Sequence, residues 1–133
     1  MKRNWIRSNH DGNRGRWASL YVTMNPHGHI FMTAHTLSKL GDPEAFVMLW
    51  DPPNHSIGLE PSTRDVKDAY PALKRSGHGG RVLRAFSYMQ EFGLTLPETI
   101  RFTDPEIDDG VLVLDMRKVT PAAKPKTKRF QVA

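Results

Sequence analysis

An internal repeat constrains the fold of this chain more than any other sequence feature. Residues 28–60 overlay on residues 80–114, with glycines and apolar residues matching in the same order. The offset between matching residues is 52 at first and 54 at the last strand, and it changes at proline-containing turns, where insertions cost little. The matches at an offset of 52 are Gly28 with Gly80, Ile30 with Val82, Leu37 with Met89, Leu40 with Phe92, and Gly41 with Gly93.

The middle of the repeat admits two alignments. An offset of 53 matches Val47 with Ile100, whereas an offset of 54 is needed to match Pro43-Glu44 with Pro97-Glu98. Both alignments keep the order of the elements, so the repeat predicts the same succession of structure in each copy.

Each copy predicts a strand, a short helix ended by glycine, and two further strands. Thr33 suits the start of the first helix because its hydroxyl can accept a hydrogen bond from a free amide in the first turn. Gly41 can adopt the left-handed conformation that ends a helix. The predicted strands are 17–24, 29–32, 46–50 and 56–60, then 80–84, 99–103 and 111–116, and the predicted helices are 34–40 and 86–92.

Units this short cannot each bury a core of their own. We therefore expect an α+β fold in which two tandem β-α-β-β repeats share one core about a pseudo-two-fold axis, as a swapped-hairpin or small barrel-like arrangement. The expected organisation is a basic N-terminal arm over 1–16, a single domain over 17–116 with repeats 17–62 and 80–116 and a connector 63–79, and a basic C-terminal tail over 117–133.

Charge is distributed unevenly along the chain. Residues 1–16 hold five basic side chains and one acid, and residues 117–133 hold six basic side chains and no acid. Because the net charge of the whole chain is +5, residues 17–116 carry −5. The basic ends favour an anionic partner, whereas the acidic body favours a basic one.

Composition bounds the cellular setting. The absence of cysteine excludes disulfides and thiolate metal sites. No apolar run approaches the roughly 18 residues that a membrane span needs, and no apolar segment of a secretory signal follows the basic start. We expect a cytoplasmic protein that does not contact membranes.

No group of residues indicates catalysis, so we do not expect an enzyme or a cofactor. His27 and His29 lie two residues apart and could share a face toward a metal ion, but a polar turn is the simpler interpretation, and we assign no metal site. Asp108-Asp109-Gly110 could join Asp104 in acid–base work. Asp and Gly are also favoured in hairpin turns, and we expect a turn.

The pattern of a strand, a short helix and a terminal glycine resembles the AbrB and MraZ families of bacterial and phage-type regulators. Their swapped-hairpin units begin with a G-R-[IV] strand and continue through a short helix into L-G. MraZ-like proteins carry two such units per chain. The residues that carry the resemblance are Gly28-His29-Ile30 with Leu40-Gly41, and Gly80-Arg81-Val82 with Phe92-Gly93.

Departures from that pattern concern the residues linked to DNA binding rather than the fold. The MraZ pattern is D-x-x-x-R, but Asn25 and His29 occupy the acid and arginine positions of the first unit. In the second unit Gly77 replaces the acid, although Arg81 fits.

The leading hypothesis is a DNA-binding regulator with a duplicated AbrB/MraZ-like core, and a homo-oligomer is left open. Phosphate contacts would come from the basic ends, and groove contacts from the second unit and the connector. The alternative is a protein–protein interaction module, an inhibitor or adaptor, that uses its acidic body. The candidate residues for contact with duplex DNA are Arg14, Arg16, Lys74, Arg75, Arg81, Arg84, Arg117 and Lys118.

Overall fold

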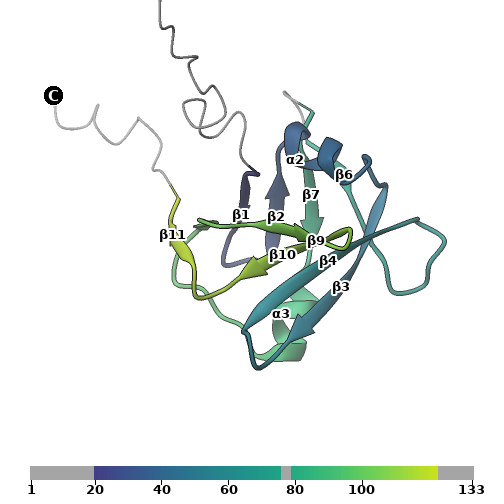
Figure 1. Cartoon of the computed structure of the whole chain (residues 1–133). Coiled ribbons are helices and arrows are strands. Elements are labelled where there is room, and N and C mark those ends of the chain that lie inside the picture. Colours follow the sequence, from purple (N-terminus) through teal and green to yellow (C-terminus); the bar gives the residue numbers. More distant parts are fainter. Residues whose placement is uncertain (1–19, 76–78, 123–133) are drawn as a thin grey trace, which may run out of the picture.

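Antiparallel strands make up most of the structure, a computed structural model that describes residues 20–75 and 79–122 (Figure 1). Within this part of the chain the strands form two sheets. Sheet A has six strands in the order β11-β8-β1-β2-β7-β6, and sheet B has five in the order β5-β3-β4-β10-β9. Two short helices complete the fold, which confirms the expected α+β class.

The elements follow the predicted strands and helices closely, and four short strands are added: β5, β6, β9 and β11. Sheet A consists of β1 (Val22–Met24), β2 (His29–Met32), β6 (Leu73–Lys74), β7 (Arg81–Arg84), β8 (Ile100–Phe102) and β11 (Val119–Pro121). Sheet B consists of β3 (Ala45–Asp51), β4 (Ser56–Ser62), β5 (Tyr70–Pro71), β9 (Glu106–Asp108) and β10 (Val111–Asp115). The helices are α2 (Ala34–Lys39) and α3 (Phe86–Phe92).

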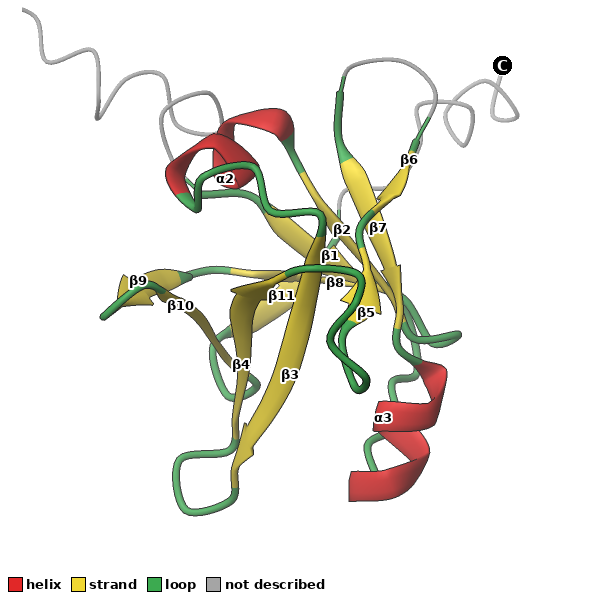
Figure 2. Cartoon of the chain, turned by 90° about the vertical axis from the view of Figure 1, so that its right-hand side faces the viewer, coloured by secondary structure: helices red, strands yellow, loops and turns green. Residues whose placement is uncertain are grey.

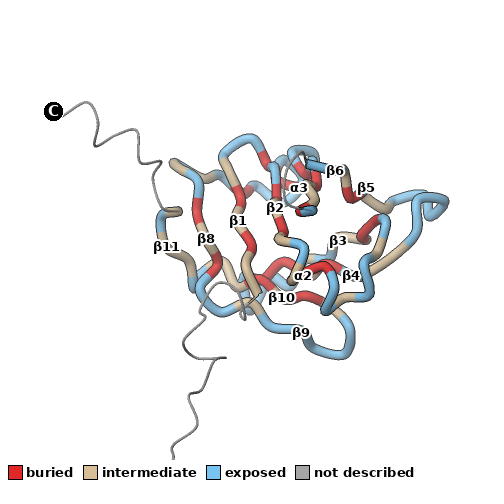
Figure 3. Tube along the Cα trace, turned by 90° about the horizontal axis from the view of Figure 1, so that it is seen from above, coloured by how far each residue is buried: buried red, intermediate tan, exposed pale blue. Residues whose placement is uncertain are grey.

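Both sheets contribute to a single core. Ile30 and Met32 of β2 and Leu83 of β7 are fully buried from sheet A, and Leu112 and Leu114 of β10 are fully buried from sheet B. Successive strand residues point to opposite faces, so these strands leave every second side chain on an outer face. Figure 3 shows the buried positions along the strands of both sheets, and Figure 2 shows α2 and α3 at opposite ends of the molecule.

The signals predicted to begin and end the helices are confirmed. The Thr33 hydroxyl accepts a hydrogen bond from the Thr36 amide at 3.3 Å at the start of α2. Gly41, just after α2, has a φ of 87°, and Gly93 ends α3 with a φ of 66°. These are left-handed conformations that favour glycine.

The spacing of the apolar residues predicts that α3 buries Phe86, Met89 and Phe92, and the structure differs from this in part. Met89 is buried as expected, but Phe86 is 53% exposed and Phe92 is 38% exposed. Tyr88 takes their place in the core at 2% exposure, and its hydroxyl donates a hydrogen bond to the Leu49 carbonyl at 2.6 Å. Burial raises the pKa of the Tyr88 hydroxyl, which keeps it a protonated donor. This buried partner explains how a polar-tipped ring occupies the core position.

The expected boundaries of the connector and the tail need correction. The tail over 117–133 begins too early, because Val119 of β11 pairs with Phe102 of β8 and adds a strand to sheet A. The connector 63–79 contains β5 and β6, and Ala72 between them is only 3% exposed. Both segments have too few apolar residues to be recognised as strands. They form strands because they pair with the edge of an existing sheet.

The middle strands of the two predicted repeats lie in different sheets. β3 pairs with β4 and β5 in sheet B, whereas β8 pairs with β1 and β11 in sheet A. The strands of the described residues are therefore divided between two sheets that share a core.

The backbone at Gly28 packs directly against the start of α3. Its φ is 84°, and a Cβ at this position would lie 2.7 Å from the backbone N and Cα of Phe86. Its carbonyl accepts a hydrogen bond from the Ala85 amide at 2.8 Å. The turn between β1 and β2 is thereby fixed to the junction of β7 and α3.

We predict that Gly28→Ala lowers the free energy of unfolding by about 2–5 kcal/mol, combining left-handed strain with overpacking. Gly41→Ala is the matched control, because Gly41 has a φ of 87° and no atom within 4 Å of an added Cβ. It should lose only the strain, about 1–2 kcal/mol. Urea denaturation of both variants measures the difference. Equal losses would contradict a close approach at Gly28.

Candidate functional site

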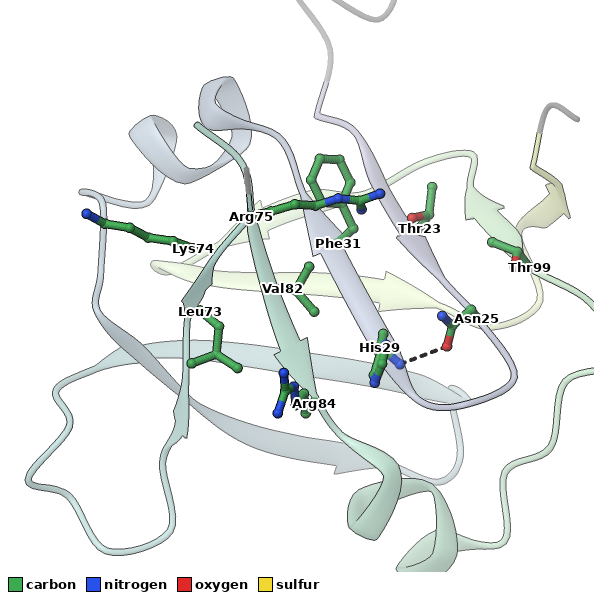
Figure 4. Close-up of a pocket in the computed structure, with 10 residues that line it drawn as sticks. All are labelled: Thr23, Asn25, His29, Phe31, Leu73, Lys74, Arg75, Val82, Arg84 and Thr99. Carbon is green, nitrogen blue, oxygen red and sulfur yellow. Dashed lines mark hydrogen bonds between the residues drawn. The ribbon is translucent and has the colours of Figure 1, made fainter. Parts of the chain in front are cut away.

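A groove of about 500 Å³ lies on the outer face of sheet A (Figure 4). Three of its lining residues are lysine or arginine and one is histidine, and the lining includes no carboxylate. This face therefore differs sharply from residues 17–116 as a whole, whose net charge is −5. The lining residues are Thr23, Asn25, His29, Phe31, Leu73, Lys74, Arg75, Val82, Arg84 and Thr99.

The pairing of β2 with β7 creates the centre of the groove. His29 lies opposite Arg84, and Phe31 lies opposite Val82. Residues directly opposite each other in an antiparallel pair place their side chains on the same face. The intervening Ile30 is fully buried. Alternation along these two strands therefore puts apolar side chains into the core and the histidine and arginine outside.

The same face continues across β1 to β8. Thr23 of β1 lines the groove and pairs with Arg101 of β8, so Arg101 adds a further, half-buried cation to this surface. Cations without neighbouring carboxylates repel one another, and a bound anion would relieve that repulsion. The arrangement is suited to binding an anion.

Arg75 is held in place by an aromatic ring. Its guanidinium lies 4.7 Å from the centroid of the Phe31 ring, and Figure 4 shows it extending over that side chain. Gly80 makes room for the ring, because a Cβ at Gly80 would come within 2.4 Å of it. The cation–π contact orients a charge that an isolated arginine on a hairpin would leave mobile.

Asn25 closes the turn at one end of the groove. Its side-chain oxygen accepts hydrogen bonds from the amides of His27 at 2.9 Å and His29 at 3.0 Å. Its carbonyl accepts a third from Gly28 at 2.9 Å. A carboxylate could accept the same bonds, but the carboxamide does so without adding negative charge to the groove.

Two of the DNA-contact residues predicted from the sequence, Arg75 and Arg84, come together here. Lys74 borders the groove, but it lies opposite Arg81 in the β6–β7 pair, and Figure 4 shows its side chain directed away from the groove. Arg81 does not line the groove, because it pairs with the buried Met32 and lies on the opposite face of β7. The Arg81 side chain donates instead to the carbonyl of Ala72 at 3.5 Å. The two arginines of β7 therefore do not share a surface.

Two other predicted residues are engaged in ion pairs. Arg117 Nε lies 3.0 Å from Asp115 Oδ1, and Lys118 Nζ lies 3.3 Å from Asp104 Oδ2. Hydrogen bonds from Arg117 hold the pKa of Asp115 below its usual range. These cations sit at the β10–β11 turn, outside the groove lining. Arg14 and Arg16 lie outside the described residues.

Sequence reasoning missed the polar and apolar partners of the groove. His29 was considered as a possible metal ligand with His27 and as a poor match to an arginine, and Phe31 was assigned only to a short strand. Alternation within each strand could have paired His29 with Phe31 on one face. Which strand then lies beside them depends on the long-range pairing of β2 with β7, and no local pattern specifies it.

The remaining candidates do not form sites. The His27 and His29 ring centroids are 6.4 Å apart, and the described residues contain no group of three or more His, Cys, Asp or Glu side chains placed to hold a metal ion. Asp109 and Gly110 have φ values of 53° and 81° between β9 and β10, which confirms the hairpin turn.

No helix in the described part of the chain is both long and apolar enough to cross a membrane.

Comparison with known proteins leaves the site to be judged on its own geometry. No protein-family model matches the chain, and no curated protein or solved structure does so either.

Asn25 allows the turn and the charge of the groove to be tested separately. We predict that Asn25→Ala lowers the free energy of unfolding by about 1–3 kcal/mol, because the His27 and His29 amides lose their acceptor. Asn25→Asp should stay close to wild type at neutral pH, since a carboxylate oxygen can accept both bonds. Chemical denaturation of the three proteins checks this. An Asp variant as unstable as the Ala variant would contradict the capping role.

Proposed function

We propose that the chain is a DNA-binding regulatory protein whose contact surface is the groove on the outer face of sheet A. The observation that carries this proposal is a groove that holds Arg75, Arg84 and His29 and no carboxylate, on a body that is otherwise acidic. Phosphate contacts by such side chains supply much of the affinity of proteins for DNA.

The shape of the edge of sheet A favours a particular mode of contact. Six strands at about 4.8 Å spacing span about 24 Å, whereas the major groove of B-DNA is about 12 Å wide and admits a two-stranded ribbon. β6 and β7 form such a ribbon at the edge of the sheet. Its groove face carries Arg84, with Arg75 just beyond β6, whereas Lys74 and Arg81 lie opposite each other on its other face. We propose that this ribbon enters the groove while the rest of the face meets the backbone.

The basic ends of the sequence would add affinity without specificity. Residues 1–16 and 117–133 carry five and six basic side chains, and polybasic segments bind phosphates through release of counterions. In this proposal the ends raise the affinity for any duplex, and the groove positions it.

A two-fold axis between adjacent copies of one strand sets the two strands antiparallel to each other. β2 pairs antiparallel with β7, its counterpart at the repeat offset of 52, and the buried Ile30 and Leu83 lie opposite each other. This pairing of counterparts supports a duplicated core of the AbrB/MraZ type.

A second pair of counterparts has the same arrangement. β4 pairs antiparallel with β10, its counterpart at the offset of 54. Burial favours 54 over 53 for the middle strand, because Phe46 and Ile100 are both buried. The middle strands β3 and β8 lie in different sheets, so the support for two copies of one unit comes from the β2–β7 and β4–β10 pairs.

The proposal is tested by affinity for a duplex of mixed sequence, measured by fluorescence anisotropy on the full chain over a series of salt concentrations. Arg84→Gln should weaken binding and reduce the salt slope by about one unit, as expected for one lost phosphate contact. Arg81→Gln is the matched control on the same strand, and it should leave the slope unchanged because Arg81 lies on the other face. Asn25→Asp should also weaken binding, since it adds a carboxylate to the groove lining.

Binding by the basic ends alone would give a different pattern. In that case Arg84→Gln and Arg81→Gln would have the same salt slope as wild type, and the groove would have no part in DNA contact. No measurable affinity for DNA at low salt in the full chain would remove the proposed function altogether.

A further inference from the structure

The outer face of sheet B has an apolar centre surrounded by carboxylates. Leu49 of β3 lies opposite Gly58 of β4, which lies opposite Val113 of β10. Val47 and Val111 extend the apolar area on the same face and are half-buried. Leu49 is 41% exposed, an unusual exposure for a large aliphatic side chain near the middle of a strand.

Gly58 lets the apolar side chains of this face close together. A Cβ there would lie 3.2 Å from the Leu49 Cβ and 3.3 Å from Val111 Cγ1, so the neighbouring strands fill the space above the glycine. The result is one continuous apolar surface across β3, β4 and β10, on which the side chains of a bound segment can pack. Glycine inside a strand otherwise weakens the strand, and it often marks a site where another backbone or a ligand approaches closely.

Four carboxylates, carried by three strands, surround this apolar centre. Asp51 and Glu60 belong to β3 and β4, and Glu106 and Asp108 belong to β9 at the edge of the sheet. All four are exposed, and none has an ion-pair partner within the described part of the chain. Asp115, on the same face, is paired with Arg117.

We infer that this face binds an extended basic segment of a partner protein, with apolar side chains at every second residue. Such a strand packs its apolar side chains on Leu49, Gly58 and Val113. Its lysine or arginine side chains leave from the opposite face, and their length lets them reach around the edges of the strand to the surrounding carboxylates. The charge argues against two other occupants. DNA phosphates would be repelled, and a second copy of the same face would set carboxylates against carboxylates.

This interaction surface does not depend on DNA binding. The groove uses the outer face of sheet A, and the docking face is the outer face of sheet B, with the shared core between them. A partner segment could therefore bind while the groove is occupied or empty.

The test uses the full chain, labelled for amide and methyl NMR, and a synthetic peptide of alternating lysine and valine as the probe. We expect resonances of Val47, Leu49, Val111 and Val113 to shift on titration, with those of the sheet A groove unchanged. Two control peptides alternate lysine with serine and glutamate with valine. Each removes one of the two proposed features, and each should bind about tenfold more weakly or not at all.

Variants of the protein make the test specific. Glu60→Lys combined with Asp108→Lys should weaken the lysine–valine peptide about tenfold, while Glu98→Lys, in the segment before β8, should not. Both substitutions change exposed or half-exposed residues, and unchanged spectra elsewhere verify the fold.

Four results would overturn the inference. The first is an absence of peptide-induced shifts on sheet B, and the second is equal binding of the glutamate–valine peptide. The third is a concentration dependence of the resonances of this face without peptide. The fourth is occupation of this face by the chain's own basic residues, detected by a spin label on Ala133→Cys in this cysteine-free chain.

Discussion

The register between β2 and β7 is the constraint on which the rest of the structure depends. Four consecutive residue pairs join these strands at the centre of sheet A. A slip by one residue would turn every side chain to the other face. Ile30 and Leu83 would then leave the core, and His29 and Arg84 would enter it. Gly28 fixes this register from the turn side, because its backbone lies against the start of α3 and accepts a hydrogen bond from Ala85.

Once this register is set, the two outer faces acquire opposite chemistry. The face of sheet A gathers lysine, arginine and histidine around Phe31, while the face of sheet B gathers carboxylates around Leu49 and Val113. The net charge of the chain conceals this separation, and so does the net charge of its body. Two surfaces of opposite sign on one core are suited to a protein that joins a polyanion to a basic partner.

The local signals in the sequence predicted most of the fold. Thr33 and the glycines at 41 and 93 correctly placed the ends of both helices, because capping depends on a few adjacent residues. The strands β5, β6, β9 and β11 were missed because they are short. β5 and β11 are held by pairing with distant strands, and β6 and β9 by pairing with the next strand along the chain. The candidate site was likewise predicted only in part. Arg75 and Arg84 were predicted as contact residues, but their separation from Lys74 and Arg81 depends on which face of the β6–β7 pair is buried, which the basic residues themselves do not encode.

The central claim is that nucleic acid meets the outer face of sheet A. The most direct test is to map amide chemical shifts of the full chain as a short duplex of mixed sequence is added. The account predicts that resonances of Thr23, His29 and Val82 shift together, while those of Leu49 and Val113 stay in place. Shifts confined to residues outside 20–122, or shifts on sheet B, would contradict it.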